Sequence, residues 1–159
     1  MIIAGTGHRP DKLGGYSKQV FDDLVYLATI GLKKYQPTLV ISGMALGWDQ
    51  ALAQAAVDLG HPFHAYIPFE GQESRWPKDS QSSFKSLISK AAHVEVCSPG
   101  GYSARAMQVR NERMVDDCDM LLALWNGTSG GTANCIRYAT QKERKLINAW
   151  SAWQKLTTT

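Results

Sequence analysis

A glycine- and hydroxyl-rich segment at residues 126–132 lies between an apolar run and a segment with helical spacing. Glycine lets the backbone approach a ligand closely, and the free N–H groups and dipole of a helix start favour an anion there. The segment therefore predicts a phosphate cradle, with an ordinary tight turn as the alternative. The residues expected to bind are Gly127, Thr128, Ser129, Gly130, Gly131 and Thr132.

Two apolar runs near the start of the chain are each followed by residues that suit an anion or a sugar. Gly7, His8 and Arg9 follow the first run and combine flexible backbone with cationic groups. Asp49 follows the second run, where it either stabilises a helix start or accepts hydrogen bonds from ribose hydroxyls. The residues of this second segment that we expect to bind the ligand are Ser42, Gly43 and Gly47.

Two later segments complete the candidate site. Arg110 and Asn111 lie in a segment with helical spacing, where Arg110 shares a face with Met114. If that face is buried, the charge needs a partner, which a bound phosphate or Asp49 would provide; a surface salt bridge is the alternative. Trp76 lies in a loop of acidic, basic and aromatic residues, and either closes over a base or packs on the domain edge.

These segments need a scaffold that brings them together, and the apolar runs predict one. The runs alternate with helix-length segments and lie at residues 2–5, 39–42, 63–68, 94–97, 120–125 and, more weakly, 146–147. Such alternation predicts an α/β, Rossmann-like, open and mainly parallel sheet of five to six strands with helices on both faces. Ligands of these sheets bind beyond the carboxyl ends of the strands, where the chemical segments fall.

Size and composition limit the classes of protein to consider. A chain of 159 residues with 44% hydrophobic residues fits one domain over 1–159. Its end, 149–159, forms a helix or tail whose apolar stripe covers the domain itself or a partner subunit in a homo-oligomer. A net charge of +3 is far from that of a general nucleic-acid binder.

The cysteine and histidine patterns indicate neither disulfides nor a metal site. Three widely spaced cysteines are an odd number, and the four histidines lack ligand spacing with them. There is no membrane-length apolar run and no signal peptide. We therefore expect a cytoplasmic protein with reduced thiols, no metal, no resident cofactor and no membrane partner.

Taken in order, residues 42–49, 110–114 and 130–133 resemble the SLOG superfamily, and within it the YpsA and YspA branch. That superfamily joins the DNA-processing protein DprA with the Lonely Guy hydrolases, and the resemblance covers most of residues 1–148. It implies a Rossmann-like sheet (the SLOG fold) with a nucleotide or nucleotide-derived ligand in its cleft. In the Lonely Guy hydrolases a catalytic glutamate follows the glycine-rich turn, whereas Cys135 occupies that position here.

Three functions for such a nucleotide site remain open. The first is hydrolysis of the N-glycosidic bond of a nucleoside 5′-monophosphate, with Asp49 as the first candidate for the catalytic carboxylate and Glu112 as the second. The second is a noncatalytic sensor of a nucleotide or an ADP-ribose-type signal, which Cys135 favours. The third is DprA-like binding of single-stranded DNA, which needs basic residues and stacking aromatics. Candidates for the latter are Lys12, Arg75, Arg105, Arg110, Tyr16, Trp48, Trp76 and Tyr102.

Overall fold

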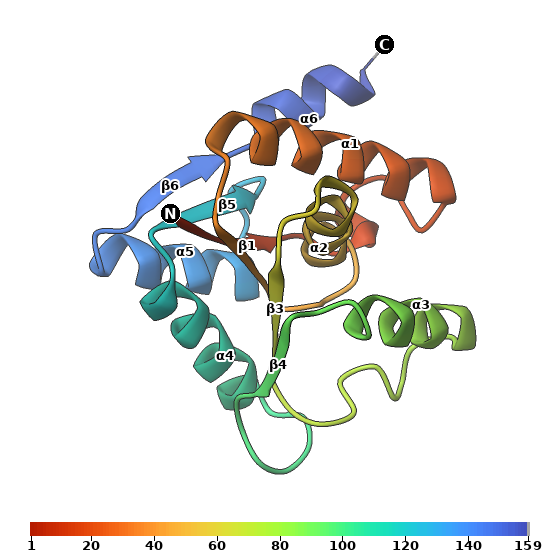
Figure 1. Ribbon diagram of the computed structural model, residues 1–159, viewed down its shortest axis with the longest axis vertical. Helices are drawn as coiled ribbons and strands as arrows, with labels where there is room; N and C mark the ends of the chain where they lie inside the picture. The colour runs from red at the N-terminus through yellow and green to blue at the C-terminus, as the bar shows by residue number, and fades with distance from the viewer. Residues whose placement is uncertain (159) are drawn as a thin grey trace.

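The sheet contains six parallel strands in the part of the chain that the computed structural model describes, residues 1–158. Each strand coincides within two residues with one of the apolar runs, which confirms the predicted Rossmann-like α/β fold (Figure 1). In order across the sheet, the strands are β4 (His93–Val96), β3 (Phe63–Ile67), β2 (Leu39–Ser42), β1 (Ile2–Gly7), β5 (Met120–Leu124) and β6 (Lys145–Asn148).

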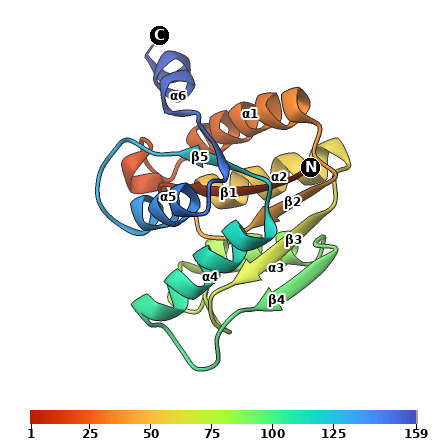
Figure 2. The same cartoon turned by 90° about the vertical axis from the view of Figure 1, so that its left-hand side faces the viewer.

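Helices cover both faces of this sheet (Figure 2). The helices on one face are α1 (Lys18–Tyr35), α2 (Trp48–Leu59), α3 (Lys78–Ile88) and α6 (Trp150–Thr157). Those on the other face are α4 (Ala104–Asp117) and α5 (Gly131–Gln141). A short 3-10 helix, η1 (Pro10–Lys12), follows β1. None of the helices within residues 1–158 has the length and apolar character needed to cross a bilayer.

Two hydrophobic clusters, one on each face, hold the layers together. Neighbouring side chains of β1 point to opposite faces, so Ile3 joins the cluster under α1 and α2 while Ala4 joins the one under α4 and α5. Strands covered on both faces consist of continuous apolar runs, which is why the sequence marks them clearly. Trp153 of α6 is buried in the first cluster, so this helix covers its own chain.

The strand order places a crevice between β1 and β5. From β1 the chain turns to β2 on one side, whereas β5 lies on the other side of β1, so the connections diverge at this point. In open parallel sheets the gap between diverging connections is the usual ligand site. The segments after β1 and β5 meet there, since the N–H of His8 donates to the carbonyl of Leu124 at 3.1 Å.

The helices that border the crevice begin in two different ways. Ser17 and Ser103 cap α1 and α4 by accepting hydrogen bonds from backbone N–H groups. By contrast, α2 and α5 begin after Gly47 and Gly130, which have φ of 95° and 140° and provide no side-chain cap. The start of α5 therefore leaves backbone donors available at the crevice, whereas at the start of α2 the N–H groups of Trp48 and Gln50 donate to the carbonyls of His8 and Ala45.

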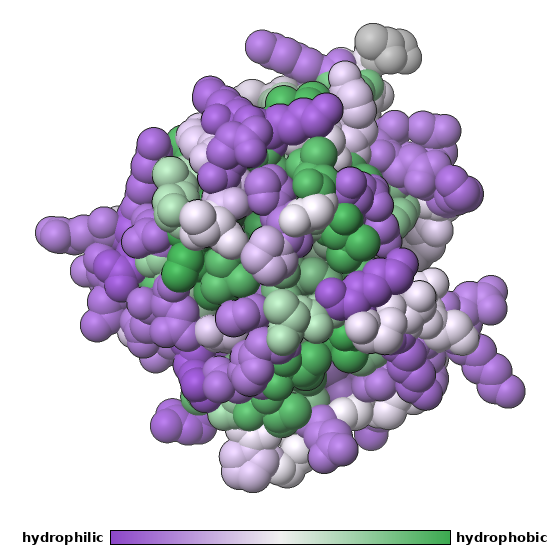
Figure 3. Space-filling view, viewed as in Figure 1, coloured by the Kyte–Doolittle hydropathy of each residue, from purple (hydrophilic) through white to green (hydrophobic). Residues whose placement is uncertain are grey.

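The two edge strands, β4 and β6, are the most exposed parts of the sheet. Figure 3 shows hydrophobic side chains gathered near the middle of this face of the molecule, over the region of β4. Val94 and Val96 are large apolar residues of that strand that remain exposed. One strand, β3, separates β4 from β2, whose carboxyl end forms part of the cavity described below.

Candidate functional site

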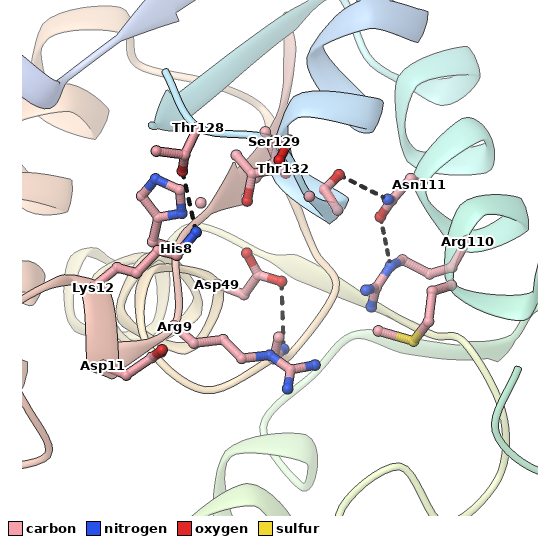
Figure 4. Close-up of a pocket in the computed structure, with 16 residues that line it drawn as sticks. His8, Arg9, Asp11, Lys12, Asp49, Arg110, Asn111, Thr128, Ser129 and Thr132 are labelled. Atoms are coloured by element: carbon pink, nitrogen blue, oxygen red, sulfur yellow. Dashed lines mark hydrogen bonds between the residues drawn. The ribbon is translucent and has the colours of Figure 1, made fainter. Parts of the chain in front are cut away.

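A cavity of about 270 Å³ lies at the carboxyl ends of β1, β2 and β5 (Figure 4). It brings together segments that are more than a hundred residues apart in the chain. Most of the residues expected to bind a ligand line it. They are Gly7, His8, Arg9, Asp49, Arg110, Asn111, Thr128, Ser129, Gly130, Gly131 and Thr132.

One side of the cavity is the turn before α5. The side chain of Asn126 shapes this turn, because its Oδ1 accepts hydrogen bonds from the backbone N–H of Thr128 at 3.1 Å and from Thr128 Oγ1 at 2.6 Å. Lys12 Nζ donates to Thr128 Oγ1 at 3.1 Å, which brings a cation to the turn. The uncapped start of α5 follows directly. Backbone donors, a helix dipole and a lysine together favour an anion.

His8 fastens the two strands that flank the crevice. Its ring Nε2 lies 2.8 Å from Asn126 Oδ1 and 3.0 Å from the backbone N of Asn126, and its carbonyl accepts a hydrogen bond from the backbone N–H of Trp48 at 3.3 Å. Burial lowers the pKa of His8, and the side-chain hydrogen bond to Asn126 opposes that effect. His8 therefore links the loops after β1 and β5 and the start of α2.

Arg110 forms the floor of the opposite side. Its side chain is only 4% exposed, and Nη1 donates to the carbonyls of Gly43 at 2.6 Å and Tyr66 at 3.4 Å, while Nε donates to Asn111 Oδ1 at 3.0 Å. Within residues 1–158 no carboxylate lies within 4.0 Å of its guanidinium. Burial lowers the pKa of Arg110, opposed by the nearby Asp49. A buried cation held only by neutral oxygens retains its attraction for an anion.

Asp49 lies in the first turn of α2, beside this cation. It is 6% exposed, its Oδ2 accepts a long hydrogen bond of 3.4 Å from Ala45 N–H, and its Oδ1 is buried without a partner among the described residues. Burial raises the pKa of Asp49 to about 6, and Arg110 opposes that rise. Figure 4 shows the carboxyl group between Arg9 and the turn at Thr128. Its free oxygen is thus a hydrogen-bonding group with no internal partner.

Arg9 completes the cationic lining. Its side chain is exposed, extends across the cavity in Figure 4, and makes no hydrogen bond or ion pair within the described part of the chain. The cavity is therefore lined by three cationic groups, from Arg9, Lys12 and Arg110, and by two carboxyl groups, from Asp11 and Asp49. With Asp49 partly protonated near neutral pH, the lining carries a positive excess.

The expected partner of Arg110 and the second catalytic candidate need correction. Asp49 does not pair directly with Arg110, whose hydrogen-bond partners are two backbone carbonyls and an amide. Glu112 does not line the cavity but a neighbouring hollow between α4 and α5, where it accepts a hydrogen bond from Gln108. The reason is helical geometry, since two residues turn the side chain about 200° around the helix axis.

Other expected binding residues lie behind the wall or outside it. Ser42 is buried and donates to the carbonyl of Asp49 at 2.7 Å, which holds the start of α2 in place. A Cβ at Gly43 would lie 2.5 Å from Arg110 Nη1, and one at Gly47 would lie 2.6 Å from the carbonyl of His8. Glycine at these two positions thus permits close packing. Gly127 lies outside the cavity lining.

The aromatic residues expected to stack on a ligand differ in how much of each side chain is exposed. Trp48 is fully buried and donates from Nε1 to the carbonyl of Leu122, so it is a core residue. Trp76 packs edge-on against Phe84 of α3 and lines a hollow beside the cavity instead of the cavity itself. Tyr16 and Tyr102 remain exposed.

Sequence reasoning missed several residues that matter here. Thr6, Asp11, Ala45 and Met107 line the cavity without having been expected to. The Asn-Gly pair that follows β5 signals a turn and would have identified Asn126 as the residue that shapes it. Cys135 is fully buried, and burial raises the pKa of its thiol to about 12, so it is an inert core residue.

Fold and site together define a class: an open parallel α/β protein with an anion-favouring crevice at its topological switch point. The chain belongs to the YspA SLOG family, whose sequence model (named YpsA) matches residues 3–152. It is 34% identical over 115 residues to the uncharacterized SPbeta prophage-derived protein YoqJ of Bacillus subtilis, covering 62% of this chain and 67% of that protein.

Solved structures with the same fold are more distant in sequence. DNA processing protein A of Helicobacter pylori, described by its single-stranded DNA binding mode, superposes with a TM-score of 0.68 at 16% identity, covering 93% of this chain and 64% of that one. The Streptococcus pneumoniae protein gives 0.65 at 20% identity over 92% of this chain, which spans about half (49%) of that longer chain. The molybdenum cofactor binding protein of Rippkaea orientalis gives 0.59 at 16% identity, covering 98% and 80%.

Proposed function

We propose that the cavity binds a nucleotide or a nucleotide-derived phosphorylated ligand, with its phosphate at the start of α5. The observation that carries this proposal is the buried guanidinium of Arg110, which has no carboxylate within 4.0 Å among residues 1–158 and lies across the cavity from an uncapped helix start. A desolvated cation facing backbone donors is suited to a phosphate, which satisfies both.

The free oxygen of Asp49 favours a ligand that carries a sugar next to the phosphate. Its unpartnered Oδ1 is an acceptor above its pKa of about 6, and ribose hydroxyls are donors that would satisfy it. Inorganic phosphate can donate to Asp49 only through its own P–OH groups. Such a contact would bring the negative charge of the phosphate up to the ionised carboxylate, which repels it. A ligand with a phosphate at one end and hydroxyls beside it therefore fits the lining better than phosphate alone.

Hydrolysis of the N-glycosidic bond is the finer version of this proposal. Cleavage develops positive charge on the sugar, which the buried carboxylate of Asp49 would stabilise in a poorly solvated site. A proton donor to the leaving base is also needed, and Glu112 lies outside the cavity. Binding without turnover, as in a sensor, is thus the simpler version of the proposed function. A hydrolase would require Asp49 together with a proton donor from solvent or from the ligand.

The DprA likeness keeps single-stranded DNA as a further candidate ligand. The exposed Tyr102 and Arg9 favour it, since stacking and backbone charge are what such ligands need. The burial of Trp48 removes one expected stacking partner. The molybdenum cofactor binding neighbour, in turn, is a precedent for a small-molecule ligand on this fold.

A binding panel tests the proposal. AMP, ADP-ribose and ribose 5-phosphate are expected to raise the unfolding midpoint of the chain, whereas adenosine, the matched control without a phosphate, is not. At about 100-fold excess over the dissociation constant, a ligand stabilises the fold by about 2.7 kcal/mol. Chromatography of the recovered ligand separates a hydrolase, which releases free base, from a sensor. If no phosphorylated compound binds while a DNA oligonucleotide does, in a salt-dependent manner, the nucleotide proposal is wrong.

A further inference from the structure

A second hollow, of about 640 Å³, opens beside the cavity and shares Arg9 and Met107 with it. The loop between β3 and α3 contributes Gln72 and Trp76 to this hollow, and the loop before α4 contributes Tyr102. A ligand held by its phosphate at the start of α5 thus has room to continue past Arg9 into the second hollow.

The walls of this hollow provide an aromatic surface. Tyr102 is 74% exposed, and its ring stands edge-on against Phe69 with the ring centroids 6.0 Å apart. Trp76 is braced in the same manner by Phe84 at 5.5 Å. Tyr102 is exposed and Trp76 half-buried, and a ring held by another ring is suited to stacking against a flat heterocycle, because stacking needs a π-face and little conformational adjustment. A base is the part of a nucleotide that fits this description.

Gln72 adds a polar group of defined direction. It is 9% exposed, its Nε2 donates to the carbonyl of Gly43 at 3.3 Å, and its Oε1 is buried with no hydrogen-bond partner among residues 1–158. A carbonyl can only accept, so the amide must keep Nε2 toward Gly43 and leave Oε1 as its free atom. The same carbonyl accepts from Arg110, so the amide is anchored to the floor of the cavity.

We propose that this hollow holds the base of the ligand and selects a base that carries an exocyclic amino group, which donates to Gln72 Oε1. The proposal rests on the proposed nucleotide function and names its substrate class. Adenine carries such a group at C6 and cytosine at C4, whereas guanine carries its amino group at C2 and an oxygen at C6. Hypoxanthine and uracil carry an oxygen in its place, so two acceptors would face each other and both would stay unsatisfied.

Matched pairs of ligands test this selectivity on the whole chain. Calorimetric titration is expected to show AMP binding at least about tenfold more tightly than IMP, and CMP more tightly than UMP by a similar factor. N6,N6-dimethyl-AMP, which keeps the adenine ring but has no amino N–H, is expected to bind like IMP. The Gln72→Met variant keeps the length of the side chain without its acceptor, and is expected to bind AMP and IMP equally.

Ribose 5-phosphate separates this inference from the function on which it rests. It carries no base, so Gln72→Met is expected to bind it as the wild type does. If the wild type binds ribose 5-phosphate but does not distinguish AMP from IMP, the base inference is overturned and the nucleotide function stands. A preference for AMP that persists in Gln72→Met also overturns it. If ribose 5-phosphate and every nucleotide fail to bind the wild type, both proposals are wrong.

Discussion

The two sides of the cavity are built in opposite ways. The turn at residues 128–132 is largely exposed and owes its chemistry to backbone N–H groups at a helix start. The facing side is formed by Asp49 and Arg110, which are almost fully buried and lack direct charged partners among residues 1–158. A cavity that favours anions can thus combine a solvated half, which lowers the stability of the fold little, with a desolvated half, which lowers it more.

The largest expected effect is that of Arg110→Met on ligand affinity. Removing a desolvated guanidinium takes away charge-assisted hydrogen bonds worth about 3 kcal/mol, so the affinity for AMP is expected to fall about 100-fold. Arg113→Met is the matched control, because Arg113 lies one turn further along α4 in a partly exposed ion pair with Glu95. Calorimetric titration of both variants measures the difference. An equal loss of AMP affinity in both variants would show that the buried guanidinium contributes no more to binding than an exposed one.

The next effect is a pH-dependent gain in stability in Asp49→Asn. Burial raises the pKa of Asp49 from 3.8 to about 6, so the folded state holds this proton more tightly than the unfolded chain does. That advantage is complete below pH 3.8 and is lost as the pH rises through about 6. Relative to the wild type, Asp49→Asn is therefore expected to be more stable at pH 8 than at pH 4, by about 2 kcal/mol.

Urea unfolding at a series of pH values measures this difference. Asp22→Asn is the control, because Asp22 is half exposed in a surface pair with Lys18. Its free energy of unfolding, relative to the wild type, is expected to change by less than about 1 kcal/mol over the same range. A flat difference for Asp49→Asn as well would mean that its carboxyl group is solvated, and the contrast between the two sides would disappear.

The smallest effect is expected on the exposed side. Lys12 donates to Thr128 in contact with solvent, so Lys12→Met is expected to weaken AMP binding by no more than about fivefold. In about 1 M salt, where the screening length is about 3 Å, that loss is expected to vanish. The effect of Arg110→Met is expected to persist in the same buffer. A salt-insensitive loss in Lys12→Met would show that this side is also desolvated.

The sequence predicts the scaffold well because the four inner strands, β1, β2, β3 and β5, are buried on both faces and leave continuous apolar runs. It also predicts the turn before α5, since glycine and hydroxyl residues act locally. The state of the buried side depends on approaches between distant atoms, such as Arg110 Nη1 and the carbonyl of Gly43, 67 residues apart. Spacing alone therefore could not show that Arg110 lacks a carboxylate partner among residues 1–158, or that Glu112 faces another hollow.

The unpartnered oxygen of Asp49 has a consequence for the lifetime of the protein. A fold that carries an unsatisfied buried acceptor opens more often than one in which that acceptor is bonded, and proteases cleave opened chains. A ligand that satisfies Asp49 and Arg110 would lower the population of opened chains and slow degradation. The abundance of this protein in a cell would then follow the supply of its ligand, even without any change in its synthesis.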